Sequence, residues 1–282
     1  MTGDFASIYR LFREAGIDET SPDSEKLISL FSIGEKCPEC SSIMNNDLDF
    51  KMVAKKRKEG VPLEYALGVA QFMDHLFYCT TDTLIPRADT SLLVETAVSA
   101  VKELQGRGRK EVRIIEIGTG CGNIAVMVAS LSKDTIIHAS DISPDAVKVA
   151  GKNVELYGLG DRIRLKVGDM FEPFRKEEAL DVVICNPPYI PSGSLQNLGR
   201  EILDHEPVLA LDAGTYGIDI FRRLIRDSLD FLRPGGVLAF EFGERQEKIV
   251  NRLLEKSGRY RDICFHEYQK IPRAVSAAKK TD

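Results

Sequence analysis

The stretch VRIIEIGTGCG, residues 112–122, decides the fold. Its first four residues are mostly apolar and predict a buried strand. The turn that follows has glycines at 118, 120 and 122, and glycines between a strand and a helix let a ligand approach the backbone closely. This spacing is more compact than the G-x-G-x-x-G of dinucleotide-binding sheets. The stretch therefore predicts an α/β sheet with a ligand site at this turn.

Three more predicted strands each end in polar residues. Residues 135–140 run into Asp141, and residues 163–167 run into Gly168-Asp169-Met170. The apolar residues 182–185 are followed by Asn186-Pro187-Pro188-Tyr189. Ligands of open parallel sheets bind beyond the carboxyl ends of the strands. We therefore expect these polar residues and the glycine turn to form one site.

The rest of the chain predicts a doubly wound, mostly parallel sheet. Strands alternate with helices predicted at residues 144–156, 217–232 and 245–257. Residues 239–242 and 264–268 are expected to close the sheet as an edge hairpin. Asp89 is expected to cap a helix whose core face is Leu92, Leu93, Thr96, Ala97, Ala100 and Leu104.

The first sixty residues predict short helices. Apolar spacing indicates one helix over residues 5–12, and Ser21-Pro22 is typical of the start of a second. A third is expected to start near Asn46 or Asp47 and to end in the basic run 55–58, which is favoured as a solvated helix end over a nucleic-acid contact. The predicted organisation is a helical domain (1–60), a β-rich linker (61–87) and an α/β domain that carries the candidate site (88–282).

Composition is that of a soluble globular protein, with 43% hydrophobic and 29% charged residues. A net charge of −5 argues against strong nucleic-acid binding. No apolar stretch suits a membrane span, and the polar start does not resemble a signal peptide. The six scattered cysteines favour reduced thiols and a cytoplasmic location. Cys37-Pro38-Glu39-Cys40 is half of a zinc motif without a second half, so no metal is predicted.

The glycine turn resembles motif I of S-adenosylmethionine-dependent methyltransferases, which implies a Rossmann-like class I methyltransferase fold. The resemblance implies that Asp141 accepts hydrogen bonds from the ribose hydroxyls and that Asp169 and Met170 lie at the adenine. The expected cofactor-binding residues are Glu116, Gly118, Thr119, Gly120, Cys121, Gly122, Asp141, Asp169, Met170 and Asn186.

Over about residues 61–275 the chain resembles the release factor glutamine methyltransferases. Besides the turn and Asp141, the segments that carry the resemblance are Pro62-Leu63-Glu64-Tyr65, Gly68, Phe72, Leu84-Ile85-Pro86-Arg87, Asp89-Thr90, Asn186-Pro187-Pro188-Tyr189-Ile190, Glu206-Pro207 and Ala210-Leu211. Ala88 and Ser91 stand where the family usually has proline and glutamate. The Asn-Pro-Pro-Tyr motif alone is shared with DNA and RNA methyltransferases.

The resemblance implies methyl transfer to the side-chain nitrogen of a glutamine in the Gly-Gly-Gln loop of peptide chain release factors. Asn186 Oδ1 and the Pro187 carbonyl would accept both N–H bonds of the target amide, and no general base is required. Asn186, Pro187 and Tyr189 are the expected catalytic residues. Pro188, Phe72 and Arg87 complete the expected substrate site, although Phe72 is equally interpreted as a core aromatic and Arg87 as a salt-bridge partner.

Three alternatives remain open from the sequence. One is a glutamine methyltransferase of a ribosomal protein, and another is an amino-methyltransferase of adenine or guanine in DNA or RNA, which would need the same acceptors. The third is a binding module that keeps the fold without catalysis. The joint presence of Gly118, Gly120, Asp141 and Asn186 argues against the third.

Overall fold

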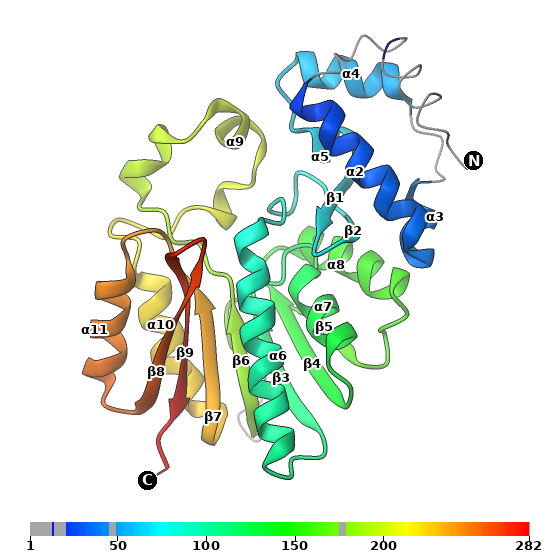
Figure 1. Ribbon diagram of the computed structural model, residues 1–282. Helices are drawn as coiled ribbons and strands as arrows, with labels where there is room; N and C mark the ends of the chain where they lie inside the picture. The colour runs from blue at the N-terminus through cyan, green and yellow to red at the C-terminus, as the bar shows by residue number, and fades with distance from the viewer. Residues whose placement is uncertain (1–12, 14–20, 45–48, 175–178, 282) are drawn as a thin grey trace.

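The computed structural model describes residue 13 and residues 21–44, 49–174 and 179–281 (Figure 1). Its centre is a seven-stranded sheet in the order β5-β4-β3-β6-β7-β9-β8. The strands are β3 (Val112–Ile117), β4 (Thr135–Asp141), β5 (Ile163–Val167), β6 (Leu180–Cys185), β7 (Leu232–Glu241), β8 (Tyr260–Tyr268) and β9 (Ile271–Lys279). Strands β3 to β7 pair in parallel, whereas β9 pairs antiparallel with its two neighbours, β7 and β8. The predicted doubly wound sheet is confirmed.

Side chains of alternate residues on the central strands belong to two different apolar cores, one on each face of the sheet. On β3, Ile114 packs with α6 (Ser91–Gly106), α7 (Asn123–Leu131) and α8 (Pro144–Leu156), whereas Ile115 packs with α10 (Asp219–Asp227) and α11 (Glu247–Ser257). Both side chains are almost fully buried. This is why the central strands are continuous apolar runs rather than alternating ones.

The N-terminal helices share a third core with the segment that follows them. They are α2 (Pro22–Lys36), α3 (Pro38–Met44) and α4 (Phe50–Lys58), followed by α5 (Leu63–Leu67) and the hairpin β1 (Val69–Phe72) and β2 (His75–Tyr78). Leu27 of α2, Val53 of α4 and Leu76 of β2 belong to this core. Figure 1 shows these elements at the same end of the large sheet as α9 (Arg200–His205).

Several N-terminal expectations need correction. Ser21 caps α2 as predicted, but α4 begins at Phe50 with Asp49 as its cap, rather than near Asn46 or Asp47. The helix expected over residues 5–12 lies outside the described residues. Residues 65–67, expected in the β-rich linker, belong to helix α5, so strands form only after the left-handed Gly68.

Asp89 does not cap α6. The chain enters α6 through the short 3-10 helix η1 (Ala88–Thr90), and no side chain caps the first turn. The Asp89 carboxylate instead pairs with Arg273 of β9, with Nη2 2.6 Å from Oδ2. On the predicted core face, Leu93, Thr96, Ala97 and Ala100 are buried, whereas Leu92 and Leu104 are half-buried.

The C-terminal strands also differ from the prediction. The helix expected over 217–232 ends as α10 at Asp227, continues as η4 (Ser228–Asp230), and gives way to β7 at Leu232. Residues 239–241 belong to β7, a parallel neighbour of β6, and the edge hairpin is formed by β8 and β9. Strand β9 escaped prediction because it contains Pro272 and three alanines, residues that are depleted in strands.

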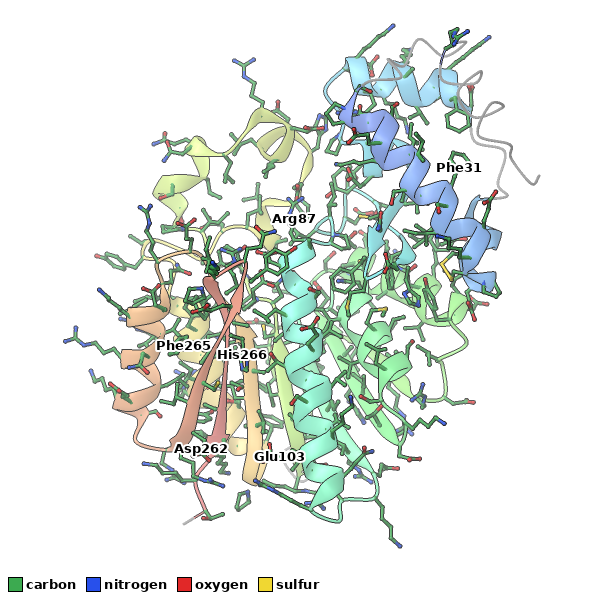
Figure 2. The ribbon with its side chains drawn as sticks, in the orientation of Figure 1. Phe31, Arg87, Glu103, Asp262, Phe265 and His266 are labelled. Carbon is green, nitrogen blue, oxygen red and sulfur yellow. A yellow bond between two sulfur atoms is a disulfide. The ribbon has the colours of Figure 1, made fainter. Side chains whose placement is uncertain are left out.

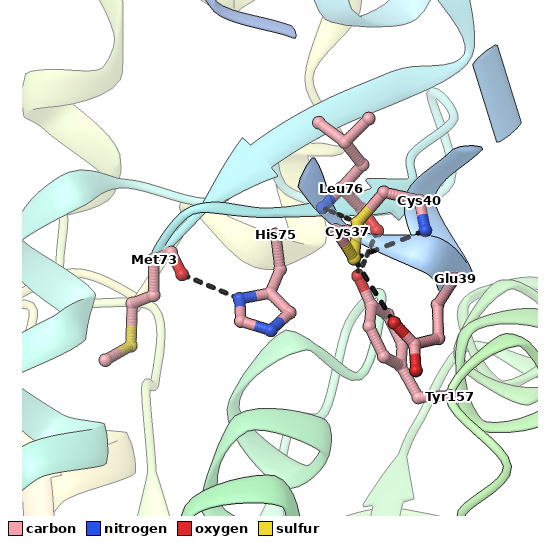
Figure 3. The surroundings of a disulfide bond; sticks show 7 residues. All are labelled: Cys37, Glu39, Cys40, Met73, His75, Leu76 and Tyr157. Atoms are coloured by element: carbon pink, nitrogen blue, oxygen red, sulfur yellow. Dashed lines mark hydrogen bonds between the residues drawn. A yellow bond between two sulfur atoms is a disulfide. The ribbon is translucent and has the colours of Figure 1, made fainter. Parts of the chain in front are cut away.

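Cys37 and Cys40 form a disulfide at the start of α3, which departs from the expectation of reduced thiols (Figure 3). Cys79, Cys121 and Cys185 are buried free thiols, whereas the free thiol of Cys264, on the edge strand β8, is exposed. Within residues 21–44, 49–174 and 179–281, no three His, Cys, Asp or Glu side chains are grouped so as to hold a metal ion. Among these same residues, no helix has both the length and the apolar composition needed to cross a bilayer.

Candidate active site

A cavity of about 490 Å³ opens at the carboxyl ends of strands β3 to β6. Eight of the ten expected cofactor-binding residues line it: Gly118, Thr119, Gly120, Cys121, Asp141, Asp169, Met170 and Asn186. Glu116 and Gly122 do not line the cavity. The sequence therefore locates the cavity correctly, because the ends of neighbouring parallel strands meet at one edge of the sheet.

The glycine turn is shaped by two different requirements. Gly120 has φ +55° with open space around it, and its N–H donates to Asp141 Oδ2 over 2.9 Å. Gly122, at φ +82°, lies against α8, where an added Cβ would be 3.2 Å from Ala150 Cβ. Gly122 thus allows α7 to approach α8, and Gly120 ties the turn to the end of β4.

Asp141 is held by two backbone donors. Its Oδ2 accepts from Gly120 and its Oδ1 accepts from Ser143, each over 2.9 Å. Burial raises the pKa of Asp141, and these N–H donors oppose the rise. Because each carboxylate oxygen has a second lone pair, Asp141 can still accept hydrogen bonds from a ligand in the cavity.

Glu116 lies beneath the turn and is fully buried. Its Oε2 accepts from Thr119 Oγ1 over 2.9 Å. Burial raises the pKa of Glu116 to about 8, so its carboxyl group is protonated in most molecules at neutral pH. The position indicates support of the turn rather than direct contact with a ligand.

Asp169, just after the end of β5, forms an ion pair with Arg223 of α10 over 2.7 Å. Met170 is buried beside it and adopts a left-handed backbone conformation, φ 49°. Arg223 also lines the cavity, as does Ile142, which follows Asp141 directly. The sequence reasoning missed both: Ile142 could have been found from its position, but the helical spacing around Arg223 carried no signal.

Asn186 is held by a residue far away in sequence. Its Nδ2 donates to Thr90 Oγ1 over 3.2 Å, and Thr90 Oγ1 donates to Glu241 Oε2 over 2.8 Å. Thr90 and Glu241 are almost fully buried, at 2% and 1% exposure. Neither Thr90 nor Glu241 was among the expected site residues.

A second cavity of about 160 Å³ adjoins the first and shares Asn186, Pro187 and Arg87 with it. Tyr189 and Glu241 line only this second cavity, whereas Pro188 lines only the first. Burial raises the pKa of Tyr189 to about 12, so its hydroxyl stays protonated. The Arg273 guanidinium donates to that hydroxyl over 3.3 Å, and Gln246 Nε2 donates to the Tyr189 backbone carbonyl over 2.9 Å.

Arg87 forms an ion pair with Glu206 and lines both cavities. Figure 2 shows it between the start of α6 and the segment that carries α9. Arg87 opposes the rise in the pKa of Glu206 that burial causes. The salt bridge expected as one alternative for Arg87 is therefore present. Arg87 also lines both cavities, so its position is compatible with the substrate-facing alternative as well.

Phe72 does not join the site. Only 3% of it is exposed, its ring lies 6.2 Å from that of Phe77 in the core, and it lines neither of the two cavities. The interpretation of Phe72 as a core aromatic is the one that the structure supports. Its substrate role is corrected because β1 turns this side chain toward the core beneath α6.

These features define a methyltransferase of the α/β class, and comparison with known proteins agrees. The family model for the methyltransferase small domain matches residues 90–215. The solved N-terminal domain of human METTL16 in complex with SAH covers 94% of this chain and 96% of its own, with a TM-score of 0.52 at 19% identity. At that identity the likeness concerns the fold alone.

Sequence relatives give the family. A release factor glutamine methyltransferase of Gloeobacter violaceus is 39% identical over 206 residues, which cover 73% of this chain and 70% of the relative. One from Rhodopirellula baltica is 31% identical over 263 residues, covering 89% and 86%. The chain belongs to the release factor glutamine methyltransferase family, so the resemblance of its motifs is confirmed.

Proposed function

We propose that this protein transfers a methyl group from S-adenosylmethionine to the side-chain nitrogen of a glutamine, in the Gly-Gly-Gln loop of peptide chain release factors. One observation supports this most. Asn186 and Pro187 line both the large cavity, which has the glycine turn and Asp141, and the small cavity beside it. An amide held at these two residues would stand at the junction of the cavities.

The larger cavity suits S-adenosylmethionine, which when bound supplies a methyl group on a positively charged sulfur. The open backbone at Gly120 admits a close ligand, and Asp141 keeps lone pairs free for ribose hydroxyls. Ile142 and Met170 provide apolar surface for a purine. The acceptors and the apolar surface thus match a nucleoside.

At the smaller cavity, the chemistry depends on acceptors. An amide nitrogen is a poor nucleophile because its lone pair is delocalised into the carbonyl. Asn186 Oδ1 and the Pro187 carbonyl would accept its two hydrogens and fix the nitrogen for attack. No base is needed first, since the nitrogen becomes far more acidic after it gains a methyl group.

The choice of a release factor as the protein substrate is supported by the size of the small cavity and by the family to which the chain belongs. A narrow cavity favours a side chain on a slender loop, which two preceding glycines would provide. We propose that the helices of the first sixty residues contact the release factor away from this loop, which raises the effective concentration of the target. Because release factors act in translation, we propose a cytoplasmic location for the reaction.

The experiment is incubation with labelled S-adenosylmethionine and four separate substrates: a release factor, ribosomal proteins, DNA and RNA. We expect label on the release factor, with tandem mass spectrometry placing it on the glutamine of Gly-Gly-Gln. Label on a ribosomal protein or a nucleic acid, with none on the release factor, would contradict the proposal. An Asn186→Ala variant serves as the control for contaminating activity.

A further inference from the structure

Three side chains from separate parts of the chain form a hydrogen-bonded relay along the border of the two cavities: Thr90 lines the large one, Glu241 the small one and Asn186 both. Asn186 follows β6, Thr90 ends η1, and Glu241 ends β7. The first bond joins Asn186 Nδ2 to Thr90 Oγ1 over 3.2 Å, and the second joins Thr90 Oγ1 to Glu241 Oε2 over 2.8 Å. Thr90 and Glu241 are only 2% and 1% exposed, so competition from bulk water for these bonds is small.

Counting donors fixes the direction of the relay. A threonine hydroxyl has a single proton and two acceptor lone pairs, whereas a carboxylate only accepts. If Glu241 is ionised, it takes the Thr90 proton, and Thr90 can then only accept from Asn186. The amide nitrogen of Asn186 must face Thr90, and its Oδ1 is the end left for a ligand.

We propose that Thr90 and Glu241 are positioning residues that orient the Asn186 carboxamide so that its oxygen, not its nitrogen, meets the target amide. This inference rests on the proposed function, since only a target with N–H donors needs an oxygen there. Neither residue has to touch the reacting atoms. They act by disfavouring the orientation of the Asn186 carboxamide in which its NH2 group, a donor, would face the NH2 group of the target, which is also a donor.

Protonation of Glu241 would reverse the relay. A protonated carboxyl can donate to Thr90, and the Thr90 proton is then free to bond Asn186 Oδ1. The Asn186 amide would turn over and its nitrogen would face the target. Activity therefore requires the ionised form of Glu241.

The surroundings of Glu241 raise the pKa of its carboxyl group, so its protonation falls near neutral pH. Burial raises the pKa of Glu241 to about 7, the Asp89 carboxylate adds to the rise, and Thr90, Arg273 and Tyr189 oppose it. The Cys185 thiol, at the end of the adjacent strand, interacts with Glu241 electrostatically, and burial raises its pKa well above the usual range, so it stays neutral. We expect kcat to fall as the pH drops through about 7.

The first test compares Thr90→Val with Thr90→Ser. Valine keeps the shape but removes the hydroxyl, and serine restores it. We expect valine to lower kcat on the order of tenfold, the value of one orienting hydrogen bond, with cofactor affinity little changed. The thermal unfolding midpoint should also fall, because Glu241 and Asn186 each lose a hydrogen-bond partner. Serine should regain most of the loss. Equal kcat for the two variants would overturn the proposal.

The second test uses Glu241→Gln, which keeps the size but cannot ionise. The wild-type acid limb in kcat near pH 7 should be absent in this variant. An unchanged limb would assign it to another group, such as Glu116, whose pKa burial raises to about 8, and would overturn the role of Glu241.

A third measurement needs no substrate, so it separates this proposal from the proposed function. The side-chain amide signal of Asn186 in an NMR spectrum is identified by its loss in Asn186→Ala. We expect this signal to shift with a midpoint near pH 7 in the wild type and to stay constant in Glu241→Gln. A signal that does not respond in the wild type overturns the relay, even if glutamine is methylated. A wild type with the shift but no glutamine methylation refutes the proposed function instead.

Discussion

The two halves of the site are built in different ways. On the cofactor side, Asp141 is held by the backbone of Gly120 and Ser143, which lie in the turns of two consecutive strand-turn-helix units, β3-α7 and β4-α8. On the target side, Asn186 depends on Thr90, 96 residues away, and Thr90 depends on Glu241, 151 residues away. The comparison teaches that the proposed cofactor side is held by nearby backbone groups, whereas the proposed target side is held by side chains from distant segments.

The largest expected effect is on the target side. Asn186→Ala removes an oriented acceptor, which should lower kcat by about 10²–10³. Cofactor affinity, measured by calorimetry, should stay within a few fold, because the backbone of the cofactor side is untouched. More than a tenth of wild-type turnover would show that the amide acceptor is not needed.

Asp141→Ala should have the opposite profile. Each charge-assisted hydrogen bond to a ribose hydroxyl contributes about 1.5–3 kcal/mol, so affinity for S-adenosylmethionine should fall by more than tenfold. At saturating cofactor, kcat should fall much less. Asp141→Asn is the matched control, since it keeps one acceptor and should lie in between. Unchanged affinity in the alanine variant would remove Asp141 from the site.

Gly122→Ala tests whether the cofactor side is a matter of backbone geometry. The new Cβ would contact α8 at 3.2 Å and sit on a left-handed backbone. We expect a loss of about 1–3 kcal/mol of unfolding free energy from crowding and strain. Gly158→Ala, also left-handed at φ +62° but in open space, isolates the backbone contribution. Equal thermal shifts for both variants would show that contact with Ala150 is unimportant.

The smallest effect is expected at the connection between α4 and α9. Arg57 pairs with Glu201 of α9 and with Asp23 of α2, Nε to Oδ2 over 2.6 Å. These groups are partly exposed, so the pair contributes little to stability. Glu201→Gln should raise KM for an intact release factor by less than threefold and leave a Gly-Gly-Gln peptide unaffected. Equal changes on both substrates would mean that α9 acts on the small cavity itself.

The same contrast explains what the sequence could predict. The glycine turn, Asp141 and Asn186-Pro187-Pro188-Tyr189 follow directly from strand ends, so the parallel sheet and its cavity were predictable. The relay was not, because nothing in the local pattern of Thr90 or Glu241 indicates a shared hydrogen bond. Arg273 was missed for a related reason: its strand contains residues that are poor strand formers, and its partner Asp89 was expected to cap a helix.

The most direct test of the central claim is the number of methyl groups that a Gly-Gly-Gln peptide accepts. Two acceptors at Asn186 and Pro187 need two N–H donors, and a glutamine that already has one methyl group retains a single donor. After long incubation with excess S-adenosylmethionine, mass spectrometry should find monomethylated glutamine only. Dimethylated glutamine, or methylation at another atom of the peptide, would contradict the account.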